Sequence, residues 1–181
     1  MIITICQLPN EKVLNDAGLL TLEKILYMKN LKDSSISICE EYLKNEELYM
    51  KIINCLTSII SKESDSFAMK CFFRTVYLTD SSVLLGKLDN FANITNHICD
   101  MVSKNTDSKE QFSYYFFEAI AIILTKLYKK DQNAYKYFSE LINGSVIKAI
   151  SSQNQEIMGY GFQLISYMMY FDQTVSEFNI V

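Results

Sequence analysis

The chain contains very few of the residues that reverse the direction of a polypeptide. Its 181 residues include one proline and five glycines. β-Sandwiches, β-barrels and doubly wound sheets need many tight turns, and these two residues build most tight turns. Their scarcity favours long helices joined by short polar links. We therefore expect an all-α fold.

The helix that follows Ser108 has the clearest pattern. Its large apolar side chains recur every three or four residues and so share one helix face: Phe112, Phe116, Ala119, Ile120, Ile123 and Leu127. Ser108 and Gln111 form a predicted capping box at its start. Lys126, Lys129 and Lys130 place positive charge in its last turns, which the helix dipole favours. The apolar run is too short and too interrupted to span a bilayer.

Similar patterns predict helices along the rest of the chain. We expect them at residues 12–28, 46–61, 67–78, 83–102, 108–130, 131–150 and 153–170, while the pattern at 36–43 is ambiguous. The segment Asp80-Ser81-Ser82 and the residue Asp131 offer predicted N-caps, and Ser152 with Gln155 forms a second capping box. Because the polar links are short, neighbouring helices should run antiparallel as hairpins.

These hairpins recur about every 40 to 45 residues, a period that is typical of HEAT repeats. Several helices are apolar on more than one face, as the central helices of a solenoid must be. We expect residues 1–181 to form a single helical-repeat domain of about four HEAT-like hairpins, as a central fragment of a longer solenoid. A compact helical bundle is the alternative, because the hairpins do not visibly resemble one another in sequence.

Charge and cysteine usage narrow the class of protein. The net charge of −4, with scattered lysines, does not indicate a nucleic-acid binder. The cysteines are odd in number and contain no close pair, which fits reduced thiols in the cytosol or nucleus: Cys6, Cys39, Cys55, Cys71 and Cys99. The N-terminal residues lack the basic and apolar regions of a signal peptide.

No group of residues indicates catalysis. His97 is the only histidine, and we interpret it as a partly exposed helical side chain. Gly159 and Gly161 interrupt an apolar helix, where they favour close helix packing over phosphate binding. The aromatic run at residues 114–117 is interpreted as core, with tyrosine hydroxyls reaching the surface. We expect no enzymatic activity, no cofactor and no metal.

Three local patterns stand out, and in two of them core packing alone would not dictate the loop Ser103-Lys104-Asn105 or Glu118. They are Ala68-Met69-Lys70 with Arg74, the tetrapeptide Val102-Ser103-Lys104-Asn105, and residues 112–120, where Glu118 interrupts an apolar helix. In this order and spacing they resemble the "MK…MR" helix, the "VSKN" loop and the "FNHYxFEAI" helix of CAS-type exportins, which belong to the importin-β superfamily. Thr106 departs from the family, which usually has a proline there.

The resemblance implies a HEAT solenoid that wraps Ran-GTP and importin-α together in the nucleus and releases both after GTP hydrolysis. It implies shuttling between nucleus and cytoplasm, no nucleic-acid binding and no membrane insertion, and it allows contacts with nuclear pore proteins. The partner-binding residues that it implies are Lys70, Arg74, Lys104, Asn105 and Glu118. Three of them, Lys70, Arg74 and Glu118, would lie on second helices of hairpins, which line the concave face in such proteins.

Two other functions stay open at the level of sequence. Another HEAT-repeat scaffold, such as an importin or a regulatory subunit of a phosphatase or kinase, would share the fold without the combination of motifs. A small helical-bundle enzyme or ligand carrier would need a polar pocket between helices, and the sequence offers no residues for one.

Overall fold

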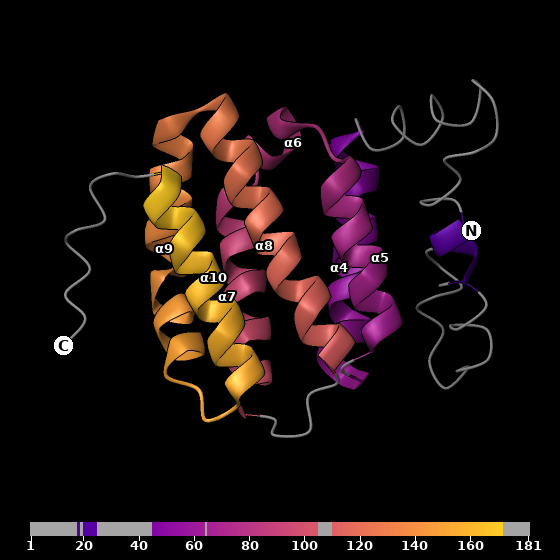
Figure 1. Cartoon of the computed structure of the whole chain (residues 1–181). Coiled ribbons are helices and arrows are strands. Elements are labelled where there is room, and N and C mark those ends of the chain that lie inside the picture. The colour runs from indigo at the N-terminus through magenta and orange to yellow at the C-terminus, as the bar shows by residue number, and fades with distance from the viewer. Residues whose placement is uncertain (1–17, 19, 25–44, 64, 105–109, 172–181) are drawn as a thin grey trace. The chain divides into compact units, whose positions relative to one another are not determined.

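The computed structural model describes residues 18, 20–24, 45–63, 65–104 and 110–171, and this part of the chain is helical with short links and no strand. Its helices are α4 (Glu46–Glu63), α5 (Ser66–Leu78), α6 (Ser81–Leu85), α7 (Leu88–Lys104), α8 (Glu110–Lys130), α9 (Gln132–Ile150) and α10 (Gln155–Phe171) (Figure 1). The predicted all-α class is confirmed.

Parts of the expected helices lie outside the described residues. Residues 18 and 20–24 of the helix expected at 12–28 are helical. The rest of that helix, the ambiguous segment at 36–43 and the capping box at Ser108 are not among the residues that the structure describes.

The chain divides into two compact units, Met1–Val83 and Leu84–Val181. In the first unit α4 packs on α5. The apolar side chains of α4 recur at helical spacing and are buried: Tyr49, Ile52, Ile53, Leu56 and Ile60. Asp65 caps α5, because its carboxylate accepts hydrogen bonds from the backbone N–H groups of Phe67 and Ala68 at 2.8 and 2.7 Å.

In the second unit, equivalent helices of two successive hairpins pack on each other. α7 packs on α9, α8 packs on α10, and α9 also contacts α8 and α10 (Figure 1). α9 begins 44 residues after α7, and α10 begins 45 residues after α8. An up-and-down four-helix bundle would place both of these pairs on its diagonals. The second unit is therefore a stack of antiparallel hairpins with the period of a HEAT repeat, as predicted.

Buried side chains fill the space between these helices. All six apolar residues predicted to share one face of α8 are buried. α8 also buries Phe117, Ala121 and Leu124, so more than one of its faces is covered, as expected for a helix within a stack. α10 differs, because it leaves Phe162 and Met169 more than half exposed, at 53% and 57%.

The prediction of a single helix at residues 83–102 is wrong. α6 ends at Leu85 and α7 begins at Leu88, with Gly86 and Lys87 between them. The Lys87 N–H donates to the Leu84 carbonyl at 3.0 Å, which closes a turn of four residues. Gly86 explains the break, because glycine is among the least favourable residues inside a helix. The cap predicted within residues 80–82 is confirmed, and the capping residue is Asp80, whose carboxylate accepts the Ser82 N–H at 2.8 Å.

The two predicted caps of the last hairpin have different outcomes. Asp131 caps α9 as predicted and accepts the N–H groups of Asn133 and Ala134 at 2.8 and 3.2 Å. The prediction of a capping box at Ser152 is wrong, because Asn154 caps α10 and its side-chain oxygen accepts the Glu156 N–H at 2.9 Å. The Ser152 hydroxyl instead accepts the Asn154 N–H at 3.2 Å and so shapes the link before the helix.

Candidate functional site

Two of the predicted partner-binding residues, Lys70 and Arg74, lie one turn apart on α5 and both contact their own unit. The Lys70 ammonium lies 2.6 Å from a carboxylate oxygen of Glu23, and the side chains of this ion pair are 31% and 20% exposed. Arg74 is buried, and its guanidinium lies 4.9 Å from the centre of the Tyr77 ring. This distance is within the range of a cation–π interaction. Both cations are thus engaged inside the first unit.

The other predicted residues belong to the second unit. Lys104 ends α7, but its side chain, like the whole of Asn105, is outside the described residues. Glu118 is half-buried on α8. The structure therefore brings Lys70 and Arg74 together on one helix and places Glu118 on another unit.

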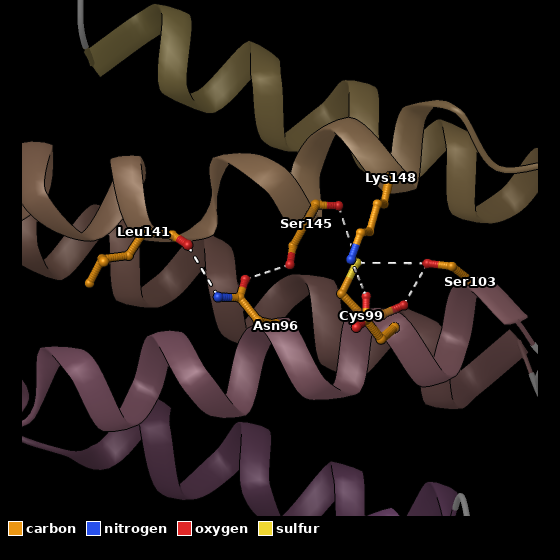
Figure 2. Close-up of polar contacts among 7 residues, drawn as sticks. Asn96, Cys99, Ser103, Leu141, Ser145 and Lys148 are labelled. Carbon is orange, nitrogen blue, oxygen red and sulfur yellow. Dashed lines mark hydrogen bonds and ion pairs between the residues drawn. The ribbon is translucent and has the colours of Figure 1, made fainter.

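A row of hydrogen bonds, which we call the polar seam, joins α7 to α9 and was not predicted from the sequence (Figure 2). The Asn96 side-chain amide donates to the Leu141 carbonyl at 3.2 Å. The Ser145 hydroxyl donates to the Asn96 side-chain oxygen at 2.5 Å. Asn96 therefore links α7 to two successive turns of α9, and hydrogen bonds of this kind fix the register of two packed helices.

Cys99 extends the seam by one turn of α7. Its thiol donates to the Ser145 carbonyl at 3.2 Å, and the Ser103 hydroxyl donates to the Cys99 carbonyl at 2.5 Å (Figure 2). Burial raises the pKa of the Cys99 thiol above its ordinary value. A buried thiol that stays protonated is a poor nucleophile. Cys99 therefore serves packing, as do the other two described cysteines, Cys55 and Cys71, which are buried and unbridged.

Charged and phenolic groups continue the contact between α7 and α9 to the surface. The Lys148 ammonium lies 2.6 Å from Asp100, and the Tyr137 hydroxyl donates to Asp89 at 2.7 Å. The residues of these pairs are separated by 48 positions, close to the 49 that separate Asn96 from Ser145. A constant separation means that α7 and α9 run parallel, as equivalent helices of successive repeats do.

A search for this seam in the sequence would have needed the repeat period. Asn96 and Ser145 are polar residues at the margins of two apolar stripes, and neither stands out alone. When the sequences of the two successive repeats are aligned, Asn96 and Ser145 fall close to equivalent positions, where their side chains are complementary hydrogen-bonding partners.

The other candidates for chemistry lie where the sequence indicated. Phe116 and Phe117 are buried, while Tyr114 is 45% exposed, so the aromatic run is core with tyrosines at the surface. His97 is exposed on α7.

Among the described residues, no three His, Cys, Asp or Glu side chains gather in a way that could hold a metal ion. None of the described helices has the length and apolar character needed to cross a bilayer.

The chain matches a known protein family. The family model described as "CAS/CSE protein, C-terminus" matches residues 23–178. Neither the comparison with curated proteins nor the comparison with solved structures gives a match. The matched range contains all the named helices, including α5 and α8, which carry two of the three motifs that resemble this family. The chain therefore belongs to the CAS/CSE family of exportin-type transport receptors, which is not a family of enzymes.

Proposed function

We propose that this chain contributes helical hairpins to a nuclear transport receptor that binds Ran-GTP and importin-α and returns importin-α to the cytoplasm. The observation that carries the proposal is the family match over residues 23–178. The stack of hairpins in the second unit supports it, because receptors of this type bind their partners along the surface of such a stack. The receptor would shuttle between nucleus and cytoplasm, as the family does.

The proposed partner-binding residues differ in how accessible their side chains are to a partner. Glu118 is partly accessible and is the most direct candidate. Lys70 is partly accessible beside Glu23, so a partner's acidic group would compete with that carboxylate for the ammonium. Arg74 is 7% exposed, so we assign it the role of supporting Tyr77 and the helix that carries Lys70. Lys104 and Asn105 complete the proposed set.

A pull-down with the full-length protein that carries this sequence tests the proposal. Importin-α and Ran-GTP are offered singly and together, and Ran-GDP replaces Ran-GTP in a control. We expect efficient capture of importin-α only together with Ran-GTP, because an exportin couples the two binding events. Capture of importin-α that does not depend on Ran would favour another HEAT-repeat scaffold.

The short chain itself gives a second readout. Residues 1–181 alone should bind Ran-GTP weakly or not at all, because contacts of this kind are spread along a whole solenoid. Tight binding of Ran-GTP by this chain would show that the contacts are local.

A further inference from the structure

Three tyrosine rings meet at the surface between α8 and α10. The rings of Tyr114 and Tyr115 pack edge to face with centres 5.3 Å apart. The ring of Tyr160, on α10, lies 6.5 Å from Tyr114. Tyr160 also stacks on the buried Phe117 ring, with centres 5.3 Å apart and planes 16° apart, which holds it in place. The three tyrosines therefore form a fixed surface to which two stacked repeats contribute.

Two carboxylates flank these rings. Glu118 follows Tyr114 by four residues and Tyr115 by three, so helix geometry places it between them on the face of α8. Glu156 precedes Tyr160 by four residues and lies beside it on α10. We define the tyrosine–glutamate patch as Tyr114, Tyr115, Glu118, Glu156 and Tyr160.

Neither carboxylate of the patch is neutralised by the part of the chain that the structure describes. Several other surface carboxylates have partners: Glu47 pairs with Lys51, Asp100 pairs with Lys148, and Asp89 accepts the Tyr137 hydroxyl. No such contact joins Glu118 or Glu156 to a described residue. The patch thus offers negative charge beside electron-rich rings, of which the Tyr114 ring is 45% exposed.

The chemistry of the patch selects the charge of its ligand. The faces of tyrosine rings attract cations, and a nearby carboxylate adds to the attraction. A phosphate or an acidic peptide would be repelled by both glutamates, and a purely apolar segment would have to desolvate them. We propose that the tyrosine–glutamate patch binds a lysine- or arginine-bearing segment of a partner protein. This assignment concerns ligand chemistry and does not depend on whether the receptor binds Ran-GTP.

Fluorescence anisotropy with a labelled oligolysine peptide tests the proposal on the 181-residue chain, with a matched oligoglutamate peptide as the reverse probe. Glu118→Gln and Tyr114→Leu should each weaken oligolysine binding about three- to fivefold, the loss expected for one exposed ion pair or cation–π contact. Tyr114→Phe should bind as the unmodified chain does, because it keeps the ring.

Two control variants separate the patch from diffuse attraction to an acidic protein. Glu140→Gln removes an exposed carboxylate of α9, and Tyr170→Leu removes a tyrosine that is 80% exposed on α10. Neither should change oligolysine affinity, and circular dichroism confirms that each variant is folded. The proposal is overturned if oligolysine does not bind, if oligoglutamate binds equally well, or if the controls weaken binding as much as Glu118→Gln does.

Discussion

Gly161 lies on α10 against the end of α9. A Cβ atom at this position would lie 2.8 Å from both the side chain and the backbone nitrogen of Ile150. At Gly159, two residues earlier on the same helix, a Cβ would meet nothing within 4 Å. The sequence indicated close packing for both glycines, and the structure confirms it for Gly161 alone.

This difference predicts opposite effects of the same substitution. Gly161→Ala should lower the free energy of unfolding by about 1–3 kcal/mol, because backbone atoms of α9 must move. Gly159→Ala should raise it by about 0.5–1 kcal/mol, because alanine favours the helix. Urea unfolding followed by circular dichroism measures both. A neutral Gly161→Ala would mean that α9 and α10 are not in close contact.

Asn96 allows a matched test of the seam. Asn96→Ala removes hydrogen bonds to the Leu141 carbonyl and the Ser145 hydroxyl, and we expect a loss of about 1–2 kcal/mol in unfolding free energy. Asn93→Ala, at an exposed position on the same helix, should change it by less than about 0.5 kcal/mol. Equal effects from the two substitutions would argue against a seam between α7 and α9.

At the scale of the helix, the spacing of apolar residues predicted most elements. The ends of the helices depend on which of several nearby polar side chains caps the first backbone N–H groups. α4, α5, α8 and α9 lie close to the residues where the pattern placed them. Ser152 and Asn154 are both good capping residues, so the sequence alone could not decide between them. Gly86 divides a pattern that reads as continuous, because an apolar stripe is insensitive to a single break.

The cap of α9 gives a prediction at this scale. Asp131→Ala removes the acceptor for the first free N–H groups of the helix and should lower the free energy of unfolding by about 1 kcal/mol. Asp131→Asn keeps an acceptor oxygen and should retain most of the stability. The midpoints of urea unfolding compare the two, and an Asn variant as unstable as the Ala variant would contradict the capping role.

At the scale of the whole molecule, the pKa shifts point to weakness at alkaline pH. Burial raises the pKa of Cys99 and of Tyr49. Asp89 raises the pKa of the Tyr137 hydroxyl, and Asp100 raises that of Lys148. Each group binds its proton more tightly in the folded chain than in the unfolded chain. Unfolding therefore releases protons, and stability must fall as pH rises.

The decline should begin near 9.0, the ordinary pKa of a thiol, and steepen through the ordinary values of 10.0 and 10.5 of the tyrosines and Lys148. Cys99→Ala should remove the part that begins first and leave most of the later part, which the tyrosines and Lys148 carry. Unfolding free energies measured across this range provide the check. A stability that is constant or rises with pH would contradict the assigned shifts.

The repeat architecture was predictable, whereas much of the candidate site was not. Period and helix polarity are properties of long segments, and they survive errors at single residues. The contacts of Asn96 with α9 and of Tyr160 with Tyr114 depend on how successive repeats are aligned, which no single helix encodes. Glu118 could be singled out because a charge inside an apolar helix is visible in the sequence alone.

Function is tested most directly by the coupling between the two proposed partners. Importin-α is titrated calorimetrically into the full-length protein that carries this sequence, first with saturating Ran-GTP and then with Ran-GDP. We predict binding at least about tenfold tighter with Ran-GTP, equivalent to a coupling free energy of about 1.4 kcal/mol or more. Equal affinities in the two titrations would contradict an exportin function.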